Sequence, residues 1–168
     1  MVKAILAGKK TKTRRVITPQ PEIGDQDVYE AIKRKCPYGN AGDTLWVRET
    51  WGAQPAMMGG ICPDTIRYRA DGEYRDEHNV WKWRPSIYLP QKYSRIILEI
   101  INVWIDQIQN ITEEDAKAEG VQPYASRIDS RMSYIEGFRR EWERLNKKRG
   151  YGWDINPLVW VIGFKRVE

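Results

Sequence analysis

The sequence predicts a mixed α+β protein, built on a curved or barrel-like β-sheet with helices on its outside. Two apolar, β-rich segments carry this prediction: a nearly continuous run from Arg95 to Ile105 and a last one from Leu158 to Val167. Runs of this kind are typical of buried strands. Between them lie two segments with helical signals. A sheet that buries one face against helices gives an α+β architecture.

The first third of the chain predicts a helix, a strand and a long loop. Apolar residues fall on one helical face within residues 1–7, and Gly8 is a residue at which helices commonly end. The β-branched residues between positions 11 and 17 favour an extended segment. Residues 18–43 are rich in Pro and Gly and predict a loop with a short helix at Gln26–Lys35.

The rest of the chain predicts short strands, loops and two helices. Thr112 is expected to cap a helix that ends at Gly120. A second helix with one apolar stripe is expected at about Arg131–Lys147. Asp71 and Gly72 together are a hairpin signal. Further strands are expected at Thr44–Trp51 and Ile66–Ala70, with irregular segments at residues 52–65 and 73–94.

Composition sets broad limits on the function. At 168 residues the chain is expected to form a single domain. Its 41% hydrophobic and 30% charged residues are those of an ordinary globular protein. The net charge of +5 and the pI near 9.2 suit a phosphate-bearing partner without requiring one. The 8 Trp and 9 Tyr can stack on bases or fill a core.

Two cysteines and one histidine limit the chemistry. The sequence shows neither a secretory segment nor a long apolar run, so we expect a cytoplasmic protein, off the membrane, with Cys36 and Cys62 as free thiols. Together with His78 they cannot make a zinc site of the usual spacing, and we expect no metal or other cofactor. A Cys-His or Ser-His-Asp arrangement would need His78, which lies in a very polar stretch and is expected to be exposed.

Residues 8–15 concentrate positive charge: five of these eight residues are cationic, and two threonines alternate with them. A solvated basic stretch would explain a charge run on its own. On a strand, side chains two positions apart share a face. One face is therefore expected to carry Lys10, Lys12 and Arg14, and the other Thr11, Thr13 and Arg15.

Four stretches spread over nearly the whole chain carry a family resemblance. They are residues 8–14 (GKKTKTR), 42–47 (GDTLWV), 111–120 (ITEEDAKAEG) and 159–164 (VWVIGF). In this order they resemble the ASCH family of the PUA-like superfamily, and the chain looks most like the small ASCH proteins of phages and prophages. The resemblance implies a single ASCH domain with a β-barrel, flanking helices and a cleft suited to RNA or a nucleoside.

One branch of this family, the bacterial N(4)-acetylcytidine amidohydrolases, uses a lysine, a threonine and a glutamate. The resemblance assigns these roles to Lys10, Thr13 and Glu119. The chain departs from the family by inserts at about residues 18–41, 52–94 and 121–131, which leave the substrate open. It also lacks the strand that usually precedes the first helix, so one sheet edge is expected to be open.

These three residues suit amide hydrolysis, which needs a nucleophile, a base and an acid. Thr13 would be the nucleophile, Lys10 the base and Glu119 the proton donor. Neighbouring cations and a closed cleft would lower the pKa of Lys10, and the helix dipole disfavours a charge on Glu119. An ion pair between the two would instead hold both charged, which leaves the balance open. Neither residue is expected to belong to the core.

Two alternatives use the same surface. One is a non-catalytic RNA-binding module of the PUA-like type, and the other is a ribonuclease. Arg48 and Glu49 are expected at the surface, although Glu49 could face the cleft. Trp83 could stack on a base or serve as a loop anchor. The candidate nucleic-acid contacts are Lys9, Lys12, Arg14, Arg15, Arg48, Trp83, Arg84 and Ser86.

Overall fold

The structure is a computed structural model that describes residues 1–21, 36–55, 60–72, 82–125 and 131–167. The helix expected at Gln26–Lys35 and the surroundings of His78 lie outside these ranges. Within them, no helix is long and apolar enough to cross a membrane. Cys36 and Cys62 are both free thiols, as expected.

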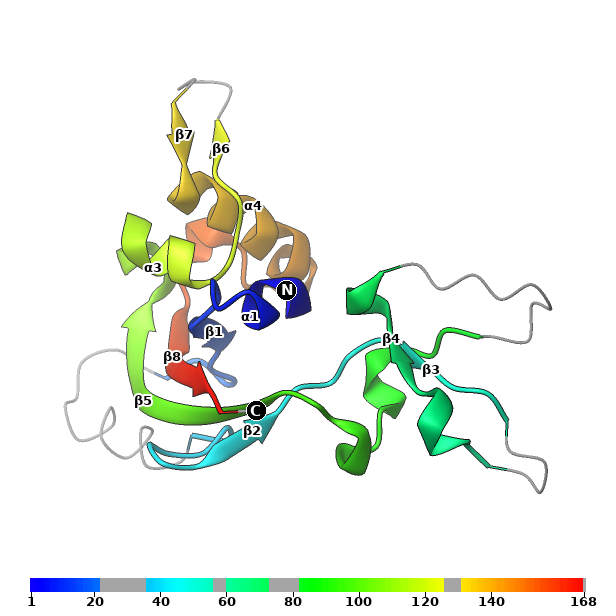
Figure 1. Ribbon diagram of the computed structural model, residues 1–168. Helices are drawn as coiled ribbons and strands as arrows, with labels where there is room; N and C mark the ends of the chain where they lie inside the picture. Colours follow the sequence, from blue (N-terminus) through cyan, green and yellow to red (C-terminus); the bar gives the residue numbers. More distant parts are fainter. Residues whose placement is uncertain (22–35, 56–59, 73–81, 126–130, 168) are drawn as a thin grey trace. The chain divides into compact units, whose positions relative to one another are not determined.

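The chain forms two compact units. The first is built mainly from Lys3–Leu45 and Leu98–Val167, and the second mainly from Trp46–Ile97. The architecture is mixed α and β, with a curved antiparallel sheet and flanking helices, which confirms the predicted fold class (Figure 1).

The first unit contains a four-stranded sheet in the order β1-β8-β5-β2. The two long strands, β5 (Ile97–Gln107) and β8 (Leu158–Arg166), pair antiparallel in its middle, which confirms both predicted central segments. β1 (Lys12–Val16) pairs antiparallel with β8 and forms one edge, and β2 (Thr44–Trp46) forms the other. In Figure 1 the ribbon of β5 curls markedly along its length.

The helices of this unit are α1 (Val2–Leu6), α3 (Glu113–Ala118) and α4 (Tyr134–Asn146). The cap expected at Thr112 is confirmed, because its hydroxyl accepts a hydrogen bond from the Asp115 N–H at 3.1 Å. Three 3-10 turns follow β5, α4 and Gly152, at Ile108–Asn110, Lys147–Arg149 and Trp153–Ile155.

α4 begins three residues later than the sequence predicted. The preceding Met132–Ser133 forms a short strand, β7, which pairs antiparallel with β6 (Tyr124–Ala125). Ser133 then caps α4, since its hydroxyl accepts a hydrogen bond from the Glu136 N–H at 3.2 Å. Residues that helical periodicity alone assigned to the helix are therefore extended, because they pair with β6.

Side chains on the two faces of β8 enter two different hydrophobic clusters. On one face, Val159 and Val161 pack with Phe138 and Trp142 of α4. On the other face, Leu158, Trp160 and Ile162 pack with Ile17 and Ile100 inside the curve of the sheet. The sheet is thus covered by helices on one side and closes on its own side chains on the other.

The second unit is a small cluster around β3 (Trp51–Gly52) and β4 (Arg67–Tyr68), which pair antiparallel. The single strand predicted at Thr44–Trp51 is therefore wrong: it is two short strands, β2 and β3, that belong to different sheets. The second half of the hairpin expected at Asp71 lies outside the described residues. Short 3-10 turns occupy Pro63–Thr65, Arg69–Asp71, Ser86–Tyr88 and Gln91–Tyr93.

Candidate active site

The start of β1 and the end of α3 bring Lys10 and Glu119 together, although 109 positions separate them in the chain. Lys10 Nζ donates to Glu119 Oε2 at 2.7 Å and to the carbonyl oxygens of Glu119 and Lys12, both at 2.8 Å. Only 3% of the Lys10 side chain and 5% of the Glu119 side chain are exposed. The expected approach of the two is confirmed, whereas the expectation that neither belongs to the core is wrong.

The turn after α1 directs Lys10 into this position. Gly8 adopts a φ of +67°, which only glycine reaches without strain. The Lys10 N–H donates to the Ala4 carbonyl at 3.0 Å, which folds the chain back on the helix. The Thr11 N–H donates to the Ala118 carbonyl at 2.8 Å. This last bond joins the start of β1 to the end of α3.

Gly120 is the second glycine that the site requires. Its φ is +75°, as suits the residue that ends α3. A Cβ atom at this position would lie 2.9 Å from Lys10 Cβ and 2.8 Å from Ala4 Cβ. Because such contacts are shorter than side chains tolerate, the close approach of Lys10 to the end of α3 depends on glycine here.

Asp115 lies one helical turn before Glu119 and extends the pair into a network. Lys12 Nζ lies 2.5 Å from Asp115 Oδ1. Arg14 Nη2 lies 2.7 Å from Asp115 Oδ2, and Arg14 Nη1 lies 3.4 Å from Glu119 Oε1. The strand face predicted to carry Lys10, Lys12 and Arg14 therefore points at α3, and these three cations share two carboxylates.

Burial and charge act in opposite directions on the network. Burial lowers the pKa of Lys10 below its ordinary value, and the charge and hydrogen bond of Glu119 oppose this without cancelling it. The guanidinium groups of Arg15 and Arg14 lower it further. Burial alone would raise the pKa of Asp115, but hydrogen bonds from Lys12 and Arg14 outweigh it and hold that pKa below its ordinary value.

A cavity of about 660 Å³ is lined by Lys10, Thr13 and Glu119 together. Thr13 pairs with Ile162 across the strands, whereas Arg14 pairs with Val161 on the other face of the sheet. Thr13 and Arg14 both line the cavity although they point to opposite faces. This is possible because β1 is an edge strand, so a cavity beside the edge reaches side chains of both faces.

The open edge of β1 also presents backbone groups. Thr11 accepts a hydrogen bond from the Phe164 N–H at 2.9 Å, and the Ile17 N–H donates to Leu158 at 3.1 Å. In an antiparallel pair the bonded residues alternate, so the odd-numbered residues of β1 bond to β8. The N–H and C=O groups that point to the open edge are therefore those of Lys12, Arg14 and Val16. No strand in the described part of the chain pairs with this edge.

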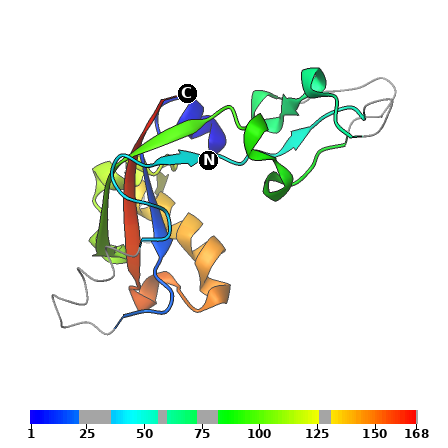
Figure 2. The ribbon, with the colours of Figure 1, turned by 90° about the horizontal axis from the view of Figure 1, so that it is seen from below.

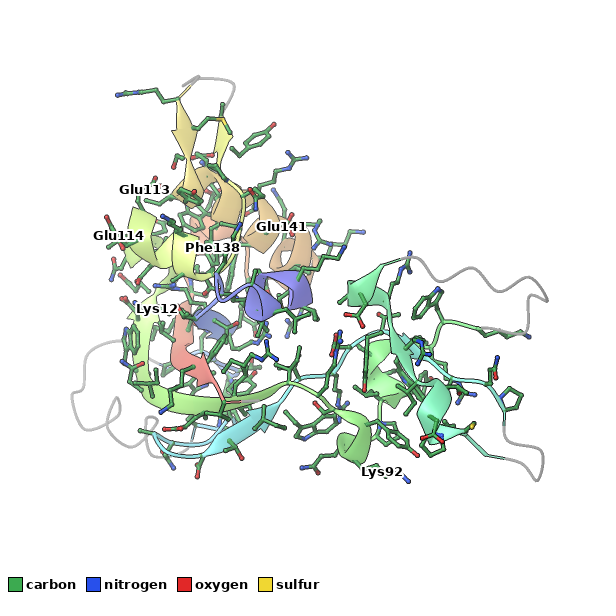
Figure 3. All side chains as sticks on the ribbon, viewed as in Figure 1. Lys12, Lys92, Glu113, Glu114, Phe138 and Glu141 are labelled. Atoms are coloured by element: carbon green, nitrogen blue, oxygen red, sulfur yellow. The ribbon has the colours of Figure 1, made fainter. Side chains whose placement is uncertain are left out.

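α4 forms the opposite wall of the cavity. Figure 2 shows this helix near β1, and Figure 3 labels Phe138 and Glu141 on it. Aromatic rings and guanidinium groups dominate this wall and the rim. The aromatic lining residues are Tyr38, Tyr124, Phe138 and Trp142, and the additional arginines are Arg15, Arg140, Arg144 and Arg149.

The predicted phosphate contacts of residues 8–15 differ in accessibility. Lys9 and Arg15 are exposed. Lys12 is half-buried against Asp115, and none of the Arg14 side chain is exposed. The basic run is thus largely paired within the protein.

The other predicted contacts, Arg48, Trp83, Arg84 and Ser86, belong to the second unit. Arg48 is exposed and lies over the Trp46 ring, 4.8 Å from its centroid. Trp83 is half-buried. The Arg84 guanidinium lies 5.2 Å from the centroid of the Trp51 ring, and Ser86 begins a 3-10 turn.

The sequence predicts Glu49 at the surface, whereas the structure shows that it is buried. Only 1% of its side chain is exposed, because Arg95 binds both of its oxygens, at 2.9 and 3.1 Å. Arg95 also binds both oxygens of Asp71, at 2.7 and 2.9 Å. These ion pairs join three separate segments of the second unit.

Sequence reasoning missed two parts of the site. Asp115 was treated only as a helix-start acid, although its spacing of four from Glu119 places both on one helical face. The arginines of the α4 wall were also missed, although Arg140 and Arg144 have the same spacing. No group of three or more His, Cys, Asp or Glu side chains in the described ranges is arranged to hold a metal ion.

Comparisons with known proteins leave the family open. No protein-family model matches the chain, and no curated protein matches it. A solved structure that resembles it is that of protein EF3133 from Enterococcus faecalis V583, described by the family model DUF984. The two share 13% identity with a TM-score of 0.45, and the alignment covers 98% of this chain. The chain spans 65% of the length of that protein. This similarity supports no statement about function.

Proposed function

We propose that the protein is an ASCH-type hydrolase that removes an acyl group from the exocyclic nitrogen of a modified pyrimidine nucleoside such as N(4)-acetylcytidine. One observation carries the proposal: the buried Lys10–Glu119 pair lines the same cavity as Thr13. In this proposal the whole chain is one ASCH domain, and the second unit is its largest insert. The free thiols of Cys36 and Cys62 fit the cytoplasmic location that we propose with it.

The Lys10–Glu119 pair can supply both the base and the acid. A proton that moves along the 2.7 Å hydrogen bond from Nζ to Oε2 turns the ion pair into a neutral amine and a neutral carboxylic acid. Burial favours this neutral form, because it removes charge from a poorly solvated site. The lowered pKa of Lys10 is a consequence of the same burial. The neutral pair then holds a base and a proton donor side by side.

Acyl transfer to Thr13 uses both groups. The Thr13 hydroxyl attacks the carbonyl carbon of the amide, and its proton passes to Lys10 Nζ. The C–N bond breaks as Glu119 gives its proton to the leaving nitrogen, which leaves an acylated threonine and the free amine of the nucleoside. Lys10 then returns its proton to Glu119 along the hydrogen bond that joins them. A water molecule attacks the ester as Lys10 takes its proton, and Glu119 gives a proton to Thr13 Oγ1, which regenerates the hydroxyl and releases the carboxylic acid. The net reaction is amide plus water to amine plus carboxylic acid.

The cavity suits the pyrimidine ring of such a substrate. A volume of about 660 Å³ lies within the range of small-molecule sites, which is about 300–1,000 Å³. Tyr38 and Tyr124 line the cavity and offer rings for stacking. The N–H and C=O groups of Arg14 and Val16 at the open edge of β1 supply a donor and acceptor pattern for the edge of a pyrimidine.

The ion-pair network favours this function over an RNA-binding module without catalysis. Such a module would use the cations of residues 8–15 to bind phosphates. Three of these cations, Lys10, Lys12 and Arg14, already pair with Glu119 and Asp115. Only Lys9 and Arg15 remain without a carboxylate partner in the described part of the chain.

The proposal is tested by incubating the purified chain with N(4)-acetylcytidine and measuring the release of cytidine and acetate. Thr13→Val and Glu119→Gln should each lower turnover by about 10²–10⁴-fold. Thr11→Val and Glu114→Gln are matched controls, because they change exposed residues of the same strand region and the same helix. They should retain the wild-type rate. In a quenched wild-type reaction, mass spectrometry should find the acetyl group on Thr13.

Absence of turnover with the wild-type chain, or equal losses in the control variants, would sink the proposal. Turnover that survives in Thr13→Val with little loss would show that water attacks directly and that Thr13 only positions it. Cleavage of a cytidine-containing RNA oligonucleotide without deacylation would favour the ribonuclease.

A further inference from the structure

We propose that the cavity binds a phosphate group, so that its ligand is a pyrimidine nucleoside monophosphate rather than a free nucleoside. The base and acyl part of this ligand rests on the proposed function, whereas the phosphate site stands on separate residues. These are arginines on α4, after α4 and on the edge strand β1.

Unpaired positive charge on the cavity wall is the first observation. Two carboxylates line the cavity, those of Glu119 and Glu141. Glu119 is occupied by the buried network, and Glu141 by Arg144, whose Nη2 lies 2.8 Å from Oε2. Three further lining guanidinium groups have no carboxylate partner within the described residues, and they belong to Arg15, Arg140 and Arg149.

The helix dipole does not account for this arrangement. Cations are favoured near the C-terminus of a helix, and α4 is followed by Lys147, Lys148 and Arg149. Of these three, Arg149 lines the cavity while the two lysines do not. Arg140 lies near the middle of α4, where the dipole has little effect, and also lines the cavity. The helix dipole therefore accounts for the presence of the two lysines at the helix end. It does not account for Arg140 and Arg149, which share a place on the cavity wall.

Two of the guanidinium groups are held in place by neutral partners. The Arg140 guanidinium lies 4.6 Å from the centroid of the Tyr124 ring. Arg149 Nη1 donates to Asn146 Oδ1 at 3.3 Å, and Asn146 is buried. Neutral partners orient the guanidinium group without neutralising its charge. A planar fork that is already oriented loses less entropy when it binds an anion.

A phosphate monoester is the ligand that this chemistry recognises. Guanidinium forks bind phosphate oxygens in a bidentate way, and a dianion accommodates two or three of them. A neutral nucleoside would leave these cations without a counter-charge. The cavity of about 660 Å³ is a size for a mononucleotide rather than for a folded nucleic acid.

Isothermal titration calorimetry with cytidine 5′-monophosphate and with cytidine tests the phosphate site directly. At low salt the monophosphate should bind the wild-type chain about ten- to a hundredfold more tightly than cytidine, and inorganic phosphate should compete. Arg140→Gln and Arg149→Gln should each weaken monophosphate binding about tenfold, and Arg149→Gln should leave cytidine binding unchanged. Lys148→Gln is the matched control: it removes an exposed cation of the same helix end that does not line the cavity.

Equal affinities for the two ligands would overturn the proposal, and so would a loss in Lys148→Gln as large as in Arg149→Gln. A 5′-phosphorylated ten-nucleotide RNA that binds much more tightly than the monophosphate would overturn the choice of a mononucleotide. Neither ligand is hydrolysed, so the result is independent of catalysis. A phosphate preference without deacylation would refute the hydrolase alone, and deacylation without a phosphate preference would refute the phosphate site alone.

Discussion

Replacement of Lys10 by Met keeps the length and volume of the side chain but removes its charge. In the wild-type protein Nζ makes three hydrogen bonds, one to the Glu119 carboxylate and two to the carbonyl oxygens of Glu119 and Lys12. After Lys10→Met the carboxylate keeps a single cation partner, Arg14 Nη1 at 3.4 Å. The variant therefore leaves a nearly buried carboxylate poorly compensated.

The loss of folding stability in Lys10→Met follows from the burial of Glu119. Removal of one partner from a buried ion pair typically costs about 3–5 kcal/mol. Glu119→Gln also removes the pair, but its neutral amide tolerates burial better than an isolated charge does. The double variant Lys10→Met/Glu119→Gln should therefore lose less than the sum of the single variants, with a coupling of about 2 kcal/mol. Lys9→Met, at an exposed position, should change stability by less than about 0.5 kcal/mol.

Urea unfolding followed by circular dichroism at pH 7 measures all four variants. The same assay at rising pH tests the lowered pKa of Lys10. Between that lowered pKa and the ordinary value of 10.5, the unfolded chain binds more protons than the folded chain. Stability from this group therefore rises with pH in this window, and Lys10→Met should abolish the rise. A loss below about 1 kcal/mol in Lys10→Met, or strict additivity in the cycle, would refute the buried pair.

Three further perturbations test the network and the second unit. The pKa of Asp115 lies below its ordinary 3.8, so the stability that this group contributes is present above pH 3.8 and is lost as the pH falls through the lower pKa. Asp115→Asn should therefore reduce the loss of stability at acidic pH, measured by urea unfolding at a series of pH values. Gly120→Ala should cost about 1–3 kcal/mol beyond Gly8→Ala, because both have positive φ but only the Cβ at 120 meets other atoms. Arg95→Met should destabilise the protein by about 3–5 kcal/mol, since it leaves the buried Glu49 unpaired.

Elements with a local cause were predicted well from the sequence. The cap at Thr112 and the stops at Gly8 and Gly120 depend on a few neighbouring residues, and the structure contains all three. The apolar segments that became β5 and β8 are long enough to be read without tertiary information. The alternation of residues 10–15 also followed from strand geometry alone.

Features set by distant contacts could not be predicted in the same way. Alternation continues from Thr44 to Trp51, yet the chain leaves one sheet and enters another within this stretch. Glu49 is buried because Arg95, 46 positions away, binds it with two hydrogen bonds. The burial of Lys10 depends likewise on the packing of α3 against β1, which no local pattern reports.

The measurement that tests the central claim most directly is the rate of cytidine release from N(4)-acetylcytidine by wild-type, Lys10→Met, Lys10→Arg and Lys9→Met proteins. Circular dichroism confirms that each is folded at the assay temperature. Lys10→Arg retains the positive charge but cannot act as a base, so it separates catalysis from stability. We expect losses of about 10²–10⁴-fold in both Lys10 variants and none in Lys9→Met. If Lys10→Arg released cytidine as fast as the wild-type protein, the assignment of Lys10 as the base would be contradicted.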